Sequence, residues 1–273
     1  MNLELVDSMY LKYWHFTKRP FDITSDPDFF FESLGHQEAI TRMTFAVETQ
    51  KAMALLTGDY GSGKTVVCDT VIGRLPPEKF KVAFITNPRM DSIDLGREIT
   101  SQLGEDVASR SMYDVLHVLN RLLERYASNG KHCAVFIDEA QLILDSSILE
   151  DLRLMLNHQL NRKFLFTLVL VGQTELRDRL KSVPQMMQRI GMRFYIPNLQ
   201  PDEVPQYIMH RLTVASGRPD IFEKSALDEI AKISNGNPRE INTLGDLCLL
   251  LGSLTGKERI RQEEVLEAWK ERS

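Results

Sequence analysis

Two groups of residues in this 273-residue chain have the types and spacing that phosphate chemistry requires. The first is the run Gly58-Asp59-Tyr60-Gly61-Ser62-Gly63-Lys64-Thr65, which fits the pattern GxxxxGK[ST] at every fixed position. Glycines let backbone N–H groups curl toward an anion with no Cβ in the way, and a following helix N-terminus adds partial positive charge. The run therefore predicts a phosphate-binding loop.

The neighbouring sequence supports this interpretation. The apolar residues that end at Gly58 are typical of a buried strand, and a helix is expected to begin at Lys64. Lys64 would bridge the β- and γ-phosphates of a nucleotide, and the Thr65 hydroxyl would hold Mg²⁺. The alternative is a chance glycine turn, which occurs in about one in a hundred sequences of this length. The predicted nucleotide-binding residues here are Gly58, Asp59, Tyr60, Gly61, Ser62, Gly63, Lys64, Thr65 and Val66.

The second group is a pair of carboxylates at the end of an apolar run. Cys133–Ile137 is followed directly by Asp138 and Glu139. Burying carboxylates at a strand end is costly unless a cation or a reaction requires them. We interpret Asp138 as the residue that organises Mg²⁺ through water, and Glu139 as the residue that polarises the attacking water. An ordinary Asp-Glu helix cap is the alternative.

A polar amide follows the next apolar run in the same way. Phe164–Val171 is predicted to be a buried strand, and it emerges at Gly172 and Gln173. Open α/β sheets bind ligands at the carboxyl ends of their strands. Gln173 is therefore a candidate for sensing the γ-phosphate; the alternative is a turn residue that hydrogen-bonds to its own backbone.

Three arginines complete the candidate set. Asn237 as N-cap, Pro238 at the first helical position and Glu240 completing a capping box place Arg239 in the first turn of a helix. A cation is slightly unfavourable there, so we interpret Arg239 as a ligand of a nucleotide phosphate. Arg189 and Arg193 lie before the apolar segment Phe194–Ile196. Surface arginines are usually solvated, so this is the ordinary expectation for either residue alone.

The elements that must position these residues alternate between strands and helices up to residue 198. Further strands are expected at Val82–Thr86 and Phe194–Ile196, with amphipathic helices at Ser92–Leu103 and Ser111–Ala127. Short helices are expected at Leu176–Leu180 and Pro184–Ile190. This order predicts an α/β fold with a five-stranded parallel sheet flanked by helices. After Pro197 only helices are expected, at 202–216, 225–234, 238–251 and 262–272, which predicts a small C-terminal all-α lid.

Three domains follow from this pattern. Residues 1–35, rich in aromatic side chains and broken by Pro20 and Pro27, are expected to form an arm packed on the core. Residues 36–198 are the predicted nucleotide-binding domain, and residues 199–273 are the predicted lid. One wall of an adenine pocket and a subunit contact are alternative roles for the arm.

Composition limits the partners and the compartment. The net charge of −5 gives the chain no global attraction to nucleic acid or to an anionic membrane. The three cysteines, Cys68, Cys133 and Cys248, lie far apart without metal-ligand spacing, which is typical of reduced core cysteines in a cytosolic protein. The N-terminus lacks the features of a signal peptide, so we expect a cytoplasmic protein.

With these motifs, the chain resembles the AAA+ ATPases, and within them the ExeA/GspA-type secretion ATPases and the related pilus-biogenesis ATPases. The Pro20-Phe21 segment after Tyr13 and the Gln188-Arg189-Ile190 run point to this subgroup. The resemblance implies an ATPase that uses ATP and Mg²⁺. It assigns the phosphate loop to Lys64 and Thr65, Walker B to Asp138 and Glu139, sensor 1 to Gln173, sensor 2 to Arg239, and an arginine finger to Arg189 or Arg193.

Such fingers act in trans, so the resemblance also implies a homo-oligomer, either ring or filament. The implied partner is an inner-membrane secretion or pilus protein, which would place the chain peripherally at that membrane. Larger members continue into a membrane span and a periplasmic part, so this chain is either a compact member or the ATPase portion of a longer protein. The alternative function is a transposition-type AAA+ regulator that oligomerises on duplex DNA, supported by clusters such as Arg177, Arg179 and Lys181.

Overall fold

The computed structural model describes residues 10–22, 26–157, 159–160 and 163–272. These residues form two compact units. One unit, here called the sheet unit, contains residues 36–59 and 67–196. The other, here called the helical unit, contains the described residues up to 35, the loop at 60–66 and the residues from 197 onward.

The sheet unit is built on five parallel strands in the order β2-β3-β6-β1-β7. The strands are β1 (Met53–Gly58), β2 (Phe80–Ile85), β3 (His132–Ile137), β6 (Phe166–Gly172) and β7 (Ile190–Ile196). This confirms the predicted five-stranded parallel sheet. Strand β7 begins at Ile190, before the predicted Phe194, and its residues alternate between part-buried and exposed, as expected for an edge strand with one covered face.

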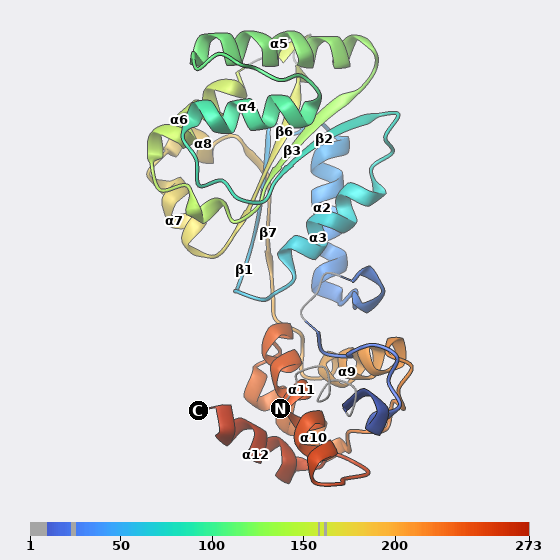
Figure 1. The fold of residues 1–273 in the computed structure, drawn as a ribbon. Helices are drawn as coiled ribbons and strands as arrows, with labels where there is room; N and C mark the ends of the chain where they lie inside the picture. The colour runs from blue at the N-terminus through green and yellow to red at the C-terminus, as the bar shows by residue number, and fades with distance from the viewer. Residues whose placement is uncertain (1–9, 23–25, 158, 161–162, 273) are drawn as a thin grey trace. The chain divides into compact units, whose positions relative to one another are not determined.

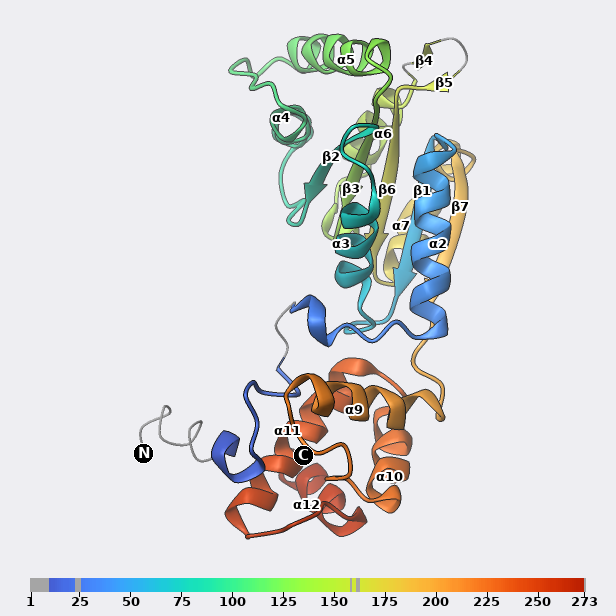
Figure 2. The same cartoon turned by 90° about the vertical axis from the view of Figure 1, so that its right-hand side faces the viewer.

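Helices cover both faces of this sheet (Figure 1 and Figure 2). On one face lie α2 (Leu34–Glu48) and α3 (Lys64–Arg74). On the other face lie α4 (Ser92–Leu103), α5 (Met112–Ser128), α6 (Ser146–Met155), α7 (Glu175–Lys181) and α8 (Pro184–Met187). A 3₁₀ turn, η2 (Ala140–Leu142), follows β3, and a short antiparallel hairpin of β4 (Gln159–Leu160) and β5 (Lys163–Phe164) precedes β6.

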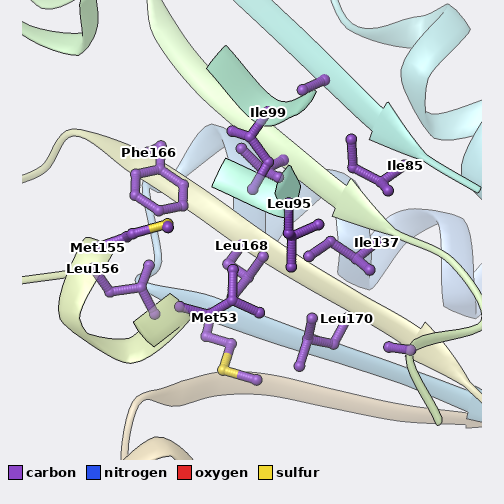
Figure 3. Packing of buried hydrophobic residues seen from close by; sticks show 14 of the residues in the cluster. Met53, Ile85, Leu95, Ile99, Ile137, Met155, Leu156, Phe166, Leu168 and Leu170 are labelled. Atoms are coloured by element: carbon purple, nitrogen blue, oxygen red, sulfur yellow. The ribbon is translucent and has the colours of Figure 1, made fainter. Parts of the chain in front are cut away.

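Successive side chains along each strand point to opposite faces of the sheet, and both faces are covered. Strand residues Met53, Val135, Ile137, Leu168 and Leu170 pack with α4 to α8 in one buried cluster (Figure 3). The intervening residues of the same strands are also buried, as expected for a parallel sheet covered on both faces. Each fully buried aliphatic side chain contributes about 1.5–3 kcal/mol, so this cluster holds the strand ends in fixed register.

The ends of α6 and α8 depend on neighbouring residues. Helix α6 begins at Ser146, and its cap is Asp145, whose carboxylate accepts a hydrogen bond from the Ser147 N–H at 2.8 Å. Helix α8 ends at Met187, before the predicted Ile190, because Ile190 already belongs to the edge strand β7. The pairing of Ile190 with Met53 of β1 therefore sets the end of α8.

The helical unit contains α9 (Glu203–Val214), α10 (Lys224–Ser234), α11 (Pro238–Leu254) and α12 (Gln262–Arg272), together with the 3₁₀ turn η1 (Pro27–Phe29). The aromatic residues before residue 35 lie in its core: Tyr10, Trp14, Phe16, Phe21 and Phe29. Two glycines of α11 make this packing possible. A Cβ on Gly245 would lie 2.7 Å from the Phe21 ring, and one on Gly252 would lie 2.9 Å from Trp14.

A buried arginine fastens this N-terminal segment. The Arg211 guanidinium donates to the backbone carbonyls of Pro20 and Asp22 and to the Tyr207 hydroxyl, and it lies 4.9 Å from the Phe29 ring centroid. Charge-assisted hydrogen bonds of this kind contribute about 1.5–3 kcal/mol each. The N-terminal aromatic segment is therefore an integral part of the helical unit.

The first residue of β3 makes the stability of the fold dependent on pH. Burial lowers the pKa of His132 from 6.5 to about 4, and a ring nitrogen shares a hydrogen bond with the Thr167 hydroxyl at 2.9 Å. In the window between these two values the unfolded chain takes up a proton that the folded chain does not, so stability falls as the pH falls.

We expect the free energy of unfolding to drop by about 2 kcal/mol between about pH 7.5 and about pH 5 because of His132 alone. Denaturant titration of His132→Asn at both pH values measures this, since the variant lacks the group that titrates. His117→Asn, at an exposed position, is the matched control and should keep the pH dependence. An unchanged dependence in His132→Asn would contradict the assignment.

Candidate functional site

The parallel register brings the ends of three strands to one edge of the sheet unit. Thr57 of β1 lies opposite Gly172 of β6, and Ile137 of β3 lies opposite Leu170. The residues that follow these strands therefore leave the sheet at the same edge. The structure brings together Asp138, Glu139 and Gln173 there, and β1 ends at the same edge with Gly58, the first residue of the Gly-rich run.

Asp138 and Glu139 are held by backbone contacts. The Asp138 N–H donates to the Ile85 carbonyl at 2.8 Å, and its carboxylate, in a residue that is only 3% exposed, accepts from the Glu139 N–H at 2.8 Å. Glu139 has φ 50° and ψ 33°, a left-handed conformation that is uncommon for a residue with a side chain. Partial burial, and then the charge of Asp138, raises the pKa of Asp69.

These residues fit a magnesium ion bound with a phosphate. Carboxylate oxygens are hard ligands, and Mg²⁺ in phosphate sites takes one or two carboxylates and completes its octahedron with water and phosphate oxygens. Among the residues described, no cluster of three or more His, Cys, Asp or Glu side chains could hold a metal on its own. The donor set therefore suits an ion that arrives with its nucleotide.

One residue at this edge was missed by the sequence reasoning. The Gln141 side-chain amide donates to the Glu139 carboxylate through Nε2, and its Oε1 accepts from the Gln173 N–H at 3.1 Å. The backbone N–H of Gln173 thus bonds to the side chain of Gln141 on another element, and its contacts are not confined to its own turn. The only sequence feature that could have indicated a role for Gln141 is its position two residues after Glu139.

The Gly-rich loop has the backbone that its sequence predicts. Gly61 has φ 79° and Gly63 has φ 84°, both in the left-handed region where a Cβ is strained. Helix α3 begins at Lys64, directly after the loop, and Lys64 is 5% exposed. A turn with this backbone directs successive N–H groups toward an anion, so the loop fits a phosphate group.

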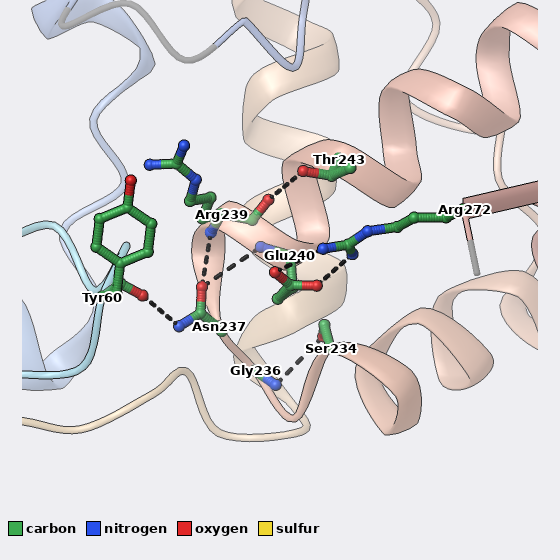
Figure 4. Close-up of polar contacts among 8 residues, drawn as sticks. All are labelled: Tyr60, Ser234, Gly236, Asn237, Arg239, Glu240, Thr243 and Arg272. Atoms are coloured by element: carbon green, nitrogen blue, oxygen red, sulfur yellow. Dashed lines mark hydrogen bonds and ion pairs between the residues drawn. The ribbon is translucent and has the colours of Figure 1, made fainter. Parts of the chain in front are cut away.

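Within the helical unit, the loop is tied to the start of α11 (Figure 4). Asn237 caps this helix, accepting from the Arg239 N–H at 3.0 Å, and its Nδ2 donates to the Tyr60 carbonyl at 2.9 Å. The Arg239 guanidinium lies 4.4 Å from the centroid of the Tyr60 ring, a cation–π contact. A Cβ on Gly61 would lie 2.5 Å from Arg239 Cβ, so glycine is also required for this close approach.

The predicted Asn237 cap is therefore confirmed, with one difference in its partner. Glu240 was expected to complete a capping box with Asn237. Its carboxylate instead forms an ion pair with Arg272 of α12, and this hydrogen bond lowers the pKa of Glu240 (Figure 4).

In the sheet unit, Asp59, which precedes Tyr60 in the Gly-rich run, also has a hydrogen-bond partner. The Tyr195 hydroxyl of β7 donates to the Asp59 carboxylate at 2.8 Å. Partial burial, followed by this hydrogen bond and the charge of Asp59, raises the pKa of Tyr195. Tyr195 was not among the predicted site residues, because its position on an edge strand shows no motif.

The two candidate finger arginines lie away from the carboxylates. Arg189 precedes the N-terminal end of β7, whereas Glu139 follows the C-terminal end of the parallel strand β3. Arg189 donates to the carbonyl of Leu156 at 3.4 Å and to the Asn157 side chain. Arg193 lies on β7, is exposed, and donates to the Met187 carbonyl at 2.9 Å. Arg189 also lines a hollow of about 1030 Å³ within the sheet unit. The other basic residues of this hollow are Lys51, Arg153 and Lys163.

Comparison with known proteins gives one family match and one curated relative. Residues 47–180 match the AAA domain family. The chain is 32% identical over 263 residues, 94% of its length, to general secretion pathway protein A of Aeromonas hydrophila, of which it spans 47%. The chain therefore spans about half the length of this curated relative.

Solved structures share the fold at low sequence identity. The Aeropyrum pernix ORC2 protein with ADPNP and ADP has a TM-score of 0.69 at 16% identity, over 93% of this chain and 71% of that chain. The Aeropyrum pernix ORC1 protein in complex with DNA has a TM-score of 0.64 at 20% identity, over 94% and 69%. The Thermotoga maritima RuvB branch migration motor has a TM-score of 0.59 at 19% identity, over 89% and 72%.

The chain therefore has a P-loop α/β fold of the AAA+ type, and the match to the AAA domain family covers about half of its length. Its resemblance to general secretion pathway protein A, inferred from the motifs, is confirmed. As for membranes, none of the helices in the described parts of the chain has the length and apolar character needed to cross a bilayer.

The two hydrogen-bonding atoms of Asn237 can be separated by substitution. Asn237→Ala removes both the helix cap and the tie to Tyr60, and should cost about 1 kcal/mol in unfolding free energy. Asn237→Asp keeps the cap acceptor but loses the Nδ2 donor, so stability should stay close to that of the unaltered chain. Hydrogen exchange at the amides of residues 60–63 should become faster in both variants. Unchanged exchange in Asn237→Asp would show that this contact does not hold the loop.

Proposed function

We propose that this chain binds and hydrolyses ATP to ADP and phosphate. The observation that carries the proposal is the sheet edge where β1 ends at Gly58, the first residue of the Gly-rich run, and where the Asp138-Glu139 pair follows β3. Both features belong to a chain whose residues 47–180 match the AAA domain family. Residues 36–198 would form the nucleotide-binding domain, residues 199–273 the lid, and residues 1–35 an arm.

Each site residue has a role in this proposal. The backbone N–H groups of residues 58–66 hold the phosphates, and Lys64 neutralises charge on the β- and γ-phosphates. Thr65 and Asp138 hold Mg²⁺, Asp138 through water; the ion, when bound, neutralises charge on the phosphoryl oxygens. Glu139 orients and polarises the attacking water, and Gln173 and Arg239 contact the γ-phosphate as sensors.

Two substitutions separate binding from chemistry. Lys64→Ala should abolish ATP binding, because the loop loses its only side-chain cation. Glu139→Gln should bind ATP with unchanged affinity yet lose turnover by about 100-fold or more, as expected when a general base is lost. Calorimetric titration and phosphate release measure the two effects, and Lys181→Ala and Glu124→Gln, both exposed, are the controls. Wild-type turnover in Glu139→Gln would remove Glu139 from the mechanism.

We further propose that the active form is a homo-oligomer, ring or filament, in which one copy supplies an arginine to the site of its neighbour. Arg189 is the preferred finger and Arg193 the second candidate. The support is that Arg189 lies at the opposite edge of the sheet from Glu139, too far to serve the site of its own subunit.

Mixing two inactive variants tests action in trans. Arg189→Ala should bind ATP but turn over about 10³-fold more slowly, as expected when an arginine finger is lost. Adding Glu139→Gln subunits, which carry Arg189 but lack the catalytic carboxylate, should restore hydrolysis. The same pair of measurements on Arg193→Ala identifies which arginine acts. Normal steady-state turnover by purified Arg189→Ala would exclude that residue.

The proposed biological role is nucleotide-dependent assembly of a secretion or pilus machine. It rests on the similarity to general secretion pathway protein A, of which the chain spans 47%. In this role the chain is cytoplasmic and joins the inner membrane only through a membrane-protein partner.

A second candidate is an AAA+ regulator that oligomerises on duplex DNA. The hollow lined by Lys51, Lys163 and Arg189 favours it; Arg153 of the same hollow pairs with Glu150. The surface cluster of Arg177, Arg179 and Lys181 is weaker support, because Lys181 pairs with Asp178. Stimulation of hydrolysis by duplex DNA, lost as salt is raised, distinguishes this function from secretion.

A further inference from the structure

Gln141 occupies a position between two residues that the proposed reaction needs. It lies on η2, directly after the Asp138-Glu139 pair, and its residue is only 9% exposed. Its Nε2 donates to the Glu139 carboxylate, and its Oε1 accepts from the Gln173 N–H at 3.1 Å. A single amide thus joins the carboxylate after β3 to the backbone at the end of β6.

The end of β6 is shaped to admit this amide. A Cβ on Gly172 would lie 2.5 Å from Gln141 Oε1, closer than real Cβ contacts allow, and 2.9 Å from a terminal carbon of Leu176. The Leu176 methyl can rotate away, but the amide oxygen is fixed by the Gln173 N–H. Glycine at residue 172 is therefore required for Gln141 to hold its place.

The backbone of Glu139 leaves the direction of its carboxylate to this contact. Glu139 is in the left-handed region, and its N–H is bonded to the Asp138 carboxylate at 2.8 Å, so the start of its side chain is fixed. Three rotatable bonds remain between that point and the carboxylate. The contact with Asp138 fixes the backbone of Glu139, whereas the contact with the Gln141 amide acts on its carboxylate.

We propose that Gln141 is a positioning residue that holds the Glu139 carboxylate against the attacking water and links its orientation to the position of Gln173. The inference rests on the proposed ATPase function. The amide occupies one carboxylate oxygen and leaves the other to accept a hydrogen bond from water. Movement of the Gln173 backbone when a γ-phosphate is present or absent is transmitted through Oε1 to Nε2, and so to Glu139.

The test compares steady-state hydrolysis of ATP by variants of the full chain. Gln141→Met keeps the volume of the side chain but has no hydrogen-bonding amide. Its kcat should fall by about 10- to 100-fold, as expected for a misplaced catalytic group, while KM and the ADP affinity stay within about twofold. Gln141→Glu should show at least the same loss, because a second carboxylate faces Glu139.

Gln102→Met is the matched control. The Gln102 amide also joins a strand to a carboxylate: its Oε1 accepts from the Phe84 N–H at 2.6 Å, and its Nε2 donates to Glu98 at 2.7 Å. Because this bridge lies between β2 and α4, its loss should change the melting temperature but not kcat. A loss of kcat in Gln102→Met equal to that in Gln141→Met would overturn the proposal, since the effect would then be general destabilisation.

A second variant tests the same contact without altering Gln141. Gly172→Ala should displace the amide and lower kcat as Gln141→Met does. In a Gln141→Ala background, where the space is open, Gly172→Ala should cause no further loss. Additive losses would contradict the proposal, as would a kcat within twofold of the unaltered chain for Gln141→Met. Absence of hydrolysis by the unaltered chain is a different result, and it would overturn the proposed function itself.

Discussion

The parallel pairing of β1, β3 and β6 is the constraint on which the rest of the structure depends. Parallel strands end at one edge, so the residues after Gly58, Ile137 and Gly172 are brought to the same edge of the sheet. Those residues are polar in a setting where burial is costly. The buried cluster beneath them, from Met53 to Leu170, supplies the stability that holds them there. The site is thus a consequence of strand register rather than of any single side chain.

Side-chain amides then hold the segments that follow the strands through hydrogen bonds. In the helical unit, Asn237 caps α11 and holds the Tyr60 carbonyl. In the sheet unit, Gln141 holds the Glu139 carboxylate and the Gln173 N–H. An amide carries a donor and an acceptor on one rigid plane, so it can connect two segments that come from distant parts of the chain. Each of these contacts involves a segment on which the proposed hydrolysis relies.

The sequence was sufficient where the signal is local. The Gly-rich loop, the apolar strands and the Asn237 cap each depend on residues within one turn or strand, and the structure contains all of them. Gln141 and Tyr195 escaped prediction because their partners, Gln173 and Asp59, are remote in sequence. The place of Trp14 and Phe21 in the helical unit depends on glycines of α11 more than 200 residues away, such as Gly245. Contacts of this kind have no periodicity that a single sequence reveals.

The central claim is that the Gly58–Thr65 loop receives the phosphates of a nucleotide. Hydrogen exchange measured at the amides of this loop, with and without a non-hydrolysable ATP analogue and Mg²⁺, tests the claim most directly. Bound phosphate oxygens would accept hydrogen bonds from these N–H groups, so the account predicts markedly slower exchange from Gly61 to Thr65 with the analogue. Unchanged exchange in this loop at saturating analogue would contradict it.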